Sequence, residues 1–331
     1  MKPPLRWSAA AGITLALIAT GPVNANPAPT TTDPDSIASS VALTKSNRMV
    51  ASDETINEVI EYWTPERMNN AVPLEVEGAP TATRQAPQPD GPPTIVSSPV
   101  PPSTTHNRNN AINTRSIAVG ILYFVSHGED SWCSASTVSS AKGRLISTAG
   151  HCLHPGGDKN APWHSNVVFV PAFDSGKEPY GKWAIVHKWS FRGWTENGKY
   201  THNIGFAETA AAGDGTTVVD RVGAHGLYVN APVQKTTLVG YNGGLWGDDD
   251  PNQYTCEDGS PIHSVGTIAI ACAAVMISAG GPYLINFDAG STWGWLTGVA
   301  RSTNLTGTAY GTYFDTKVRG LYDDAEEASD G

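Results

Sequence analysis

The residues with the clearest potential for chemistry lie in the stretch Leu145-Ile146-Ser147-Thr148-Ala149-Gly150-His151-Cys152. An apolar, β-prone run ends there in small residues, which are followed by a histidine and a cysteine. A histidine that acts as a general base needs a rigid strand end, small neighbours that leave room for a substrate, and a covalent brace. Cys133 is the candidate disulfide partner of Cys152. The alternative is a buried structural histidine beside a disulfide, because a single motif is only a hypothesis.

The stretch resembles the histidine motif of the chymotrypsin/trypsin-like serine peptidases. Hydrolysis of an amide by such a peptidase needs a nucleophile, a base that deprotonates it, and hydrogen-bond donors for the tetrahedral oxyanion. In this family the base histidine comes first in the sequence, then an orienting aspartate, then the nucleophilic serine. The resemblance therefore assigns the base to His151 and implies two further positions downstream.

The position implied for the aspartate holds an asparagine. The family pattern of aspartate, apolar, small, apolar matches the run that begins at Asn203, 52 residues after His151. Asparagine is neutral and can donate as well as accept, so we expect it to select the wrong histidine tautomer and to leave an imidazolium without a counter-charge. In a trypsin-like enzyme this change costs about 10⁴ in turnover. The alternative is that Asn203 is an ordinary turn residue.

The position implied for the nucleophile holds an alanine. The family motif Gly-x-Ser-Gly-Gly-Pro matches Ile277–Pro282, in which Gly280, Gly281 and the proline are intact. Ala279 replaces the serine, which removes covalent catalysis and leaves at most the residual effect of binding and oxyanion contacts. Ile277 replaces the glycine whose N–H helps to form the oxyanion hole, and we expect its β-branched side chain to crowd that hole.

Two neighbouring positions also depart from the family. Ser278 stands where trypsin-like zymogens have the aspartate that pairs with a new amino terminus, and Arg301 stands where a small residue usually lies beside the triad. Ser278 is also the alternative nucleophile, one residue upstream of the required position. By resemblance, the base of the specificity pocket includes Ala273 and Ala274, which offer no group that selects charge.

The sequence predicts no metal site and no cofactor. His151 and His154 form an H-x-x-H pair, but this is not the i, i+4 helical pair of metalloproteases, and no partner acid accompanies it. The chain of 331 residues has a net charge of −10 and no notable cluster of lysine or arginine, which argues against nucleic acids and anionic membranes as partners.

The first third of the chain predicts export and processing. Residues 1–25 have the basic start, apolar run and small-residue end of a secretory signal peptide, so we expect an extracellular protein with no membrane association after its removal. Residues 26–112 are interpreted as a prosegment and a proline-rich linker, the alternative being a permanent tail. One helix is predicted there from the apolar stripe Ile56, Val59, Ile60 and Trp63, and Pro80–Pro102 is predicted to be an extended linker.

Residues 113–331 predict an all-β domain. Short apolar runs alternate with turn-rich pieces, without regular alternation of strands and helices. Four cysteines in an exported chain suggest two disulfides, and proximity favours Cys133–Cys152 and Cys256–Cys272 among the three possible pairings. The resemblance implies two six-stranded antiparallel β-barrels of the trypsin-like fold, with a C-terminal helix, predicted here over residues 315–325, on the second barrel.

Two functional hypotheses follow from these residues. The first is a monomeric, secreted, non-catalytic homologue, or pseudopeptidase, that keeps its cleft as a binding surface for a peptide or protein. The second is a serine endopeptidase that cleaves peptide bonds with Ser278 or a rearranged site. Ala279 favours the first hypothesis, because the serine of the motif is missing.

Overall fold

The computed structural model describes residues 33–75, 89–103, 115–242, 251–259, 261–272, 277–288, 290–304 and 306–328. The predicted signal peptide lies outside these ranges. No helix within them is long and apolar enough to cross a membrane.

Six antiparallel strands close into a first barrel. Their order is β8-β7-β4-β5-β6-β9, and pairing of β9 with β8 closes the ring. The strands are β4 (Val119–Ser126), β5 (Glu129–Thr137), β6 (Leu145–Thr148), β7 (Ser165–Pro171), β8 (Trp183–Phe191) and β9 (Gly205–Thr209). β-Branched and aromatic residues dominate strands such as β4, in which all eight residues are buried.

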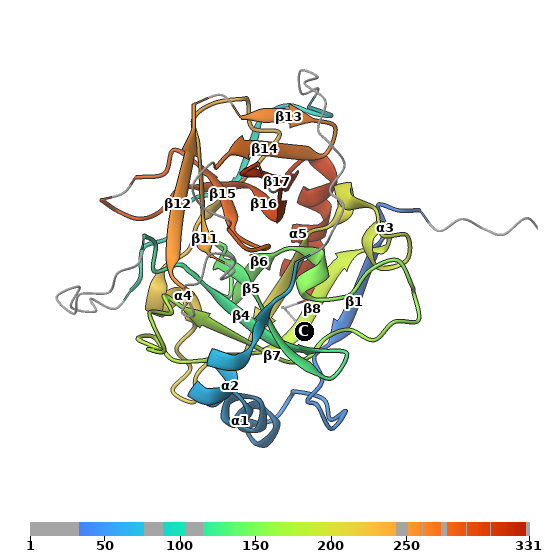
Figure 1. Cartoon of the computed structure of the whole chain (residues 1–331), viewed down its shortest axis with the longest axis vertical. Coiled ribbons are helices and arrows are strands. Elements are labelled where there is room, and N and C mark those ends of the chain that lie inside the picture. The colour runs from blue at the N-terminus through green and yellow to red at the C-terminus, as the bar shows by residue number, and fades with distance from the viewer. Residues whose placement is uncertain are drawn as a thin grey trace, which may run out of the picture. The chain divides into compact units, whose positions relative to one another are not determined.

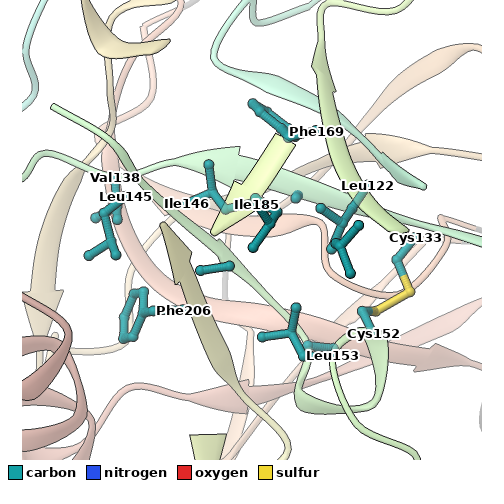
Figure 2. Packing of buried hydrophobic residues seen from close by; sticks show 14 of the residues in the cluster. Leu122, Cys133, Val138, Leu145, Ile146, Cys152, Leu153, Phe169, Ile185 and Phe206 are labelled. Atoms are coloured by element: carbon teal, nitrogen blue, oxygen red, sulfur yellow. A yellow bond between two sulfur atoms is a disulfide. The ribbon is translucent and has the colours of Figure 1, made fainter. Parts of the chain in front are cut away.

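The interior of this barrel is filled by side chains from every strand. Figure 2 shows fully buried side chains from all six, namely Leu122, Cys133, Ile146, Phe169, Ile185 and Phe206. The disulfide between Cys133 and Cys152 lies at the edge of this cluster, with Leu153 beside it. The core therefore fixes both the end of β6 and the residues that follow it.

A second antiparallel sheet has the order β12-β11-β15-β16-β17-β14-β13. Its strands are β11 (Thr236–Tyr241), β12 (Gln253–Asp258), β13 (Ile262–Ser264), β14 (Thr267–Ala271), β15 (Pro282–Ile285), β16 (Trp295–Thr303) and β17 (Thr308–Tyr313). The disulfide Cys256–Cys272 joins β12 to the residue after β14. Both predicted disulfides are therefore present, and the all-β class is confirmed, with one closed six-stranded antiparallel barrel, a second sheet and a C-terminal helix.

The C-terminal helix α5 (Thr316–Ala328) is present, with Val318, Leu321, Tyr322 and Ala325 buried. It contacts β8 and β9 of the first barrel, where the rings of Tyr322 and Phe206 are 5.8 Å apart, and also β10 (Gly226–Val229). This differs from the expected placement on the second barrel. The apolar stripe of α5 instead belongs to the same buried cluster as the first-barrel residue Phe206.

The N-terminal segment is built into the first barrel. Figure 1 follows it in blue from β1 (Ile37–Val41), which pairs with β8, through α1 (Asp53–Tyr62) and α2 (Pro65–Asn70) to β2 (Val72–Pro73). The predicted helix is confirmed, with Ser52 as its N-cap. Trp63 is fully buried, and its indole N–H donates to the carbonyl of Asn166 at 2.6 Å.

Part of the predicted linker is a strand. β3 (Thr94–Ser97) pairs with β10, and Val100 exchanges backbone hydrogen bonds with Ala224. The prolines stand before and after Thr94–Ser97 and not within it, so the four residues of the strand keep their N–H groups. Prolines next to an edge strand are compatible with pairing. A high proline content alone therefore does not distinguish an extended linker from a paired strand.

Short helices complete the described fold. They are η1 (Gly150–Cys152), α3 (Arg192–Thr195), η2 (Tyr200–His202) and α4 (Val218–Val222). The helix η1 contains His151, and η2 ends directly before Asn203, so these two helices carry or precede residues of the predicted triad.

Candidate functional site

His151 lies in η1, three residues after the end of β6, and is almost fully buried. Its neighbour Cys152 is tied to Cys133 on β5. Gly150 is required at this point because a Cβ there would lie 2.9 Å from the Trp194 ring and 3.1 Å from Oδ1 of Asn203. The small residue therefore leaves space for the Asn203 side chain to reach the histidine.

Asn203 follows η2 and contacts both the backbone and the ring of the histidine. Its Oδ1 accepts from the backbone N–H of His151 at 2.9 Å, and its Nδ2 and Oδ1 lie 3.0 Å and 3.2 Å from Nδ1 of the His151 ring. Asn203 is itself fully buried. The structure thus brings together the predicted base and the residue at the predicted aspartate position.

The surroundings keep His151 neutral. Burial lowers the pKa of its imidazole to about 4, the Asn203 contact opposes this fall, and the charge of Arg301 adds to it. Nε2 of His151 makes no hydrogen bond of normal geometry among the described residues, although the carbonyl of Leu74 faces the ring and raises its pKa. A neutral Asn203 supplies no negative charge to stabilise the protonated form.

Ala279 lies at a tight turn that backbone hydrogen bonds hold in place. The N–H of Ser134 on β5 donates to the carbonyl of Ala279 at 2.7 Å, and the N–H of Gly280 donates to Ala300 on β16 at 2.8 Å. Gly280 has φ +88°, and a Cβ there would lie 1.9 Å from the carbonyl oxygen of Ser134. The positive φ and the lack of space explain why the motif has a glycine at position 280. Position 279, one residue earlier, has no hydroxyl.

The hydroxyl of Ser278 contacts another serine and not a histidine that could act as its base. Its Oγ lies 2.9 Å from Oγ of Ser134, which in turn accepts from the N–H of Tyr241 at 3.0 Å. Its own N–H donates to the carbonyl of Tyr241. Ser278 is buried, and none of its hydrogen bonds among the described residues involves His151.

The side chain of Ile277 packs in the core of the second sheet with residues such as Leu238 and Tyr283. Its Cγ2 fills the space beside Gly240, where an added Cβ would lie 2.5 Å away. The expectation that this side chain crowds the oxyanion hole stays a prediction, because the same Cγ2 also lies beside Gly281 of the motif. Its carbonyl accepts from Oγ1 of Thr303 at 3.2 Å.

Arg301 is buried in β16, and its charge acts on His151. Its Nη2 donates to Oγ1 of Thr267 at 3.3 Å, and its guanidinium carbon lies 5.7 Å from the centre of the Tyr200 ring. Its Nε and Nη1 have no partner among the described residues. Burial lowers the pKa of Arg301 to about 10, so the group stays charged at neutral pH.

Three other predicted features complete the site. Ala273 and Ala274 lie outside the described residues. Sγ atoms of Cys133 and Cys152 lie close to His151, but the disulfide between them removes the thiolates that a metal would need. His154 accepts from the N–H of Gly156, and its Nε2 lies 3.0 Å from the carbonyl oxygen of Ala161, so both ring nitrogens have partners.

Sequence reasoning missed two residues at the site, Leu74 and Glu75. The carbonyl of Leu74 lies 4.0 Å from Sγ of Cys133 and faces His151, whose pKa it raises. The carboxyl of Glu75 lies at the backbone N–H of Ala279, a contact that lowers the pKa of Glu75. No spacing or motif marks these residues, because they reach the site through strand pairing alone.

The closed barrel, the second sheet and the C-terminal helix match the chymotrypsin/trypsin-like serine peptidase fold, and the chain has this fold. It is similar to the crystal structure of a thermostable serine protease, AL20, from an extremophilic microorganism, with 28% identity and a TM-score of 0.58 over 64% of this chain and 98% of that one. No protein-family model and no curated protein sequence matches the chain.

Two further solved structures share the fold. The protease Anisep from Arthrobacter nicotinovorans is 27% identical, with a TM-score of 0.58 over 64% of this chain and 96% of that one. A Glu endopeptidase in complex with MPD is 14% identical, with a TM-score of 0.51 over 70% of this chain and 99% of that one. At that identity the second likeness shows the fold alone.

Proposed function

We propose that this protein is a secreted, monomeric, non-catalytic member of its fold, a pseudopeptidase whose cleft binds a peptide or protein. One observation carries the proposal: the residue that precedes the Gly-Gly-Pro turn, Ala279, has no hydroxyl. Without a nucleophile at this turn no acyl-enzyme forms, and hydrolysis loses its covalent route.

The neighbouring groups support this reading. A neutral His151 whose Nδ1 faces an amide is a poor general base, since a base needs a pKa near the working pH. Ser278, the alternative nucleophile, forms its side-chain hydrogen bond with Ser134 and not with a histidine. Two formed disulfides are typical of an oxidising compartment and support export.

The test is reaction of the purified protein with a fluorophosphonate probe, followed by mass spectrometry of labelled peptides. A serine protease active under the same conditions is the positive control, and Ser278→Ala is the matched variant. We expect no labelling of either form of this protein. Labelling at Ser278 that is lost in S278A would instead establish the endopeptidase hypothesis.

A further inference from the structure

Residues Val72–Glu75 of the N-terminal segment reach the triad positions, and they form the cleft segment. Its strand β2 pairs in parallel with β5, opposite Ser131 and Trp132. The N–H of Leu74 then donates to the carbonyl of Trp132 at 2.9 Å. Because the next residue of β5 is Cys133, the pairing carries the cleft segment directly to the disulfide beside the histidine.

The end of the cleft segment contacts both halves of the site. The Leu74 carbonyl faces His151, and the Glu75 carboxyl lies at the N–H of Ala279. Loss of hydration in the cleft raises the pKa of Glu75 above its ordinary value, and the Ala279 N–H works against that rise.

This arrangement does not place a peptide bond of the cleft segment where a nucleophile at position 279 would attack it. In the fold's reaction the backbone N–H groups of the motif receive the carbonyl oxygen of the peptide bond that is cleaved. Here a side-chain carboxyl lies at the N–H of Ala279 instead. The cleft segment therefore fills the site as a bound strand and not as a substrate.

The cleft segment is tethered close to its site. Trp63, nine residues upstream of Val72, is buried in the core, and β1 is paired with β8. A tethered segment binds at a high effective concentration, which a free competitor in solution has to overcome. The anchoring residues thus make the cleft segment a strong competitor for any external peptide.

We propose that the site beside β5 binds an extended peptide in parallel with Ser131 and Trp132, with a carboxyl or carboxamide side chain at the N–H of Ala279, and that the chain's own cleft segment fills this site in the full-length protein. The inference rests on the proposed function, because it names the ligand chemistry and the regulation of the same cleft. An external partner binds only when the cleft segment is displaced.

The test uses the full chain and a fluorescent peptide with the sequence of residues 71–75, Ala-Val-Pro-Leu-Glu. Anisotropy is measured with the native chain, with the double variant Leu74→Pro/Glu75→Ala, and with Glu66→Gln. The double variant removes the N–H that bonds Trp132 and the carboxyl at Ala279. Glu66 is exposed in α2, just before the cleft segment, so E66Q is the matched charge control.

We expect the double variant to bind the peptide at least about 10-fold more tightly than the native chain and E66Q, because the tethered competitor is weakened. A peptide that ends in leucine in place of glutamate should bind the double variant more weakly. Hydrogen exchange should find the Leu74 amide protected in the native chain. Thermal unfolding should confirm that the double variant is folded, since neither residue belongs to the buried core.

Other outcomes separate the two proposals. Equal peptide binding by the native chain and the double variant, or a freely exchanging Leu74 amide, would overturn the occupied-cleft inference. Cleavage of the bound peptide, detected by mass spectrometry, would overturn the proposed non-catalytic function while leaving the binding mode in place.

Discussion

The backbone N–H of His151 fixes the orientation of the Asn203 amide. An N–H can donate only to the oxygen, so Oδ1 takes the 2.9 Å contact with the backbone and Nδ2 is left 3.0 Å from Nδ1 of the ring. Nδ1 lies 3.0 Å from the donor Nδ2 and 3.2 Å from the acceptor Oδ1, so the shorter contact favours Nδ1 as an acceptor. With Nδ1 accepting, the proton of the neutral ring is on Nε2, the nitrogen that would have to be free to accept a proton from a nucleophile.

The first prediction concerns the charge at position 203. Asn203→Asp should raise the pKa of His151 from about 4 by about 1–3 pH units, because a carboxylate at hydrogen-bond distance stabilises the imidazolium. NMR titration of the histidine ring resonances measures this value directly. The buried ring of His225 serves as an internal control, and an unchanged His151 titration would show that residue 203 does not govern its protonation.

The second prediction concerns the anchor of the N-terminal segment. Trp63→Ala should lower the free energy of unfolding by about 3–5 kcal/mol, because it empties a fully buried aromatic site and leaves the carbonyl of Asn166 without its indole donor. Chemical denaturation of the full chain measures the loss.

The matched control for Trp63 is Tyr62→Phe, which keeps the ring and removes only the hydroxyl that bonds Asp130 at 2.6 Å. It should cost no more than about 1.5–3 kcal/mol, the range for a hydrogen bond to a charged group. Equal small losses in both variants would mean that residues 33–75 contribute little to the stability of the barrel.

Local patterns in the sequence were enough to predict much of this structure. The stripe that ends in Trp63 has helical spacing, so α1 follows from residues within one segment. Each disulfide joins cysteines that lie fewer than twenty positions apart, and proximity identified both pairs. The order of His151, Asn203 and Ala279 was sufficient to place them in one fold family.

Features that depend on pairing across long stretches of the chain were not predictable. The contact of Leu74 with Trp132 joins β2 to a strand nearly sixty residues away, and no local pattern specifies that register. The same reason applies to β3, whose partner β10 lies far downstream. The buried position of the Ile277 side chain depends on Gly240 leaving space on a neighbouring strand.

The third prediction concerns the turn that carries position 279. Gly280→Ala should destabilise the protein by more than about 3 kcal/mol, because φ is +88° and the new Cβ would meet the Ser134 carbonyl at 1.9 Å. Gly320→Ala is the control, since this helical glycine in α5 has open space around it and should gain about 0.5–1 kcal/mol. Thermal and chemical unfolding compare the two. A tolerated G280A would mean that the turn is not held against β5.

The fourth prediction concerns a buried lysine on β8. Lys188 is 1% exposed, its ammonium donates to the carbonyl of His164 at 2.6 Å, and burial lowers its pKa to about 7 from the ordinary 10.5. Between these two values the unfolded chain binds more protons than the native chain, so stability contributed by this group rises with pH from about 7 to 10.5 and is lost as pH falls.

Lys188→Met should therefore flatten the rise of the unfolding free energy between pH 7 and pH 10, by a slope of at most about 1.4 kcal/mol per pH unit, the limit for one proton. Denaturant unfolding at several pH values measures both chains. Lys142, which is not in the buried core, is the control site, and K142M should keep the native slope. If K188M also keeps the native slope, the ammonium of Lys188 is already solvated in the folded protein and its burial does not shape the pH response.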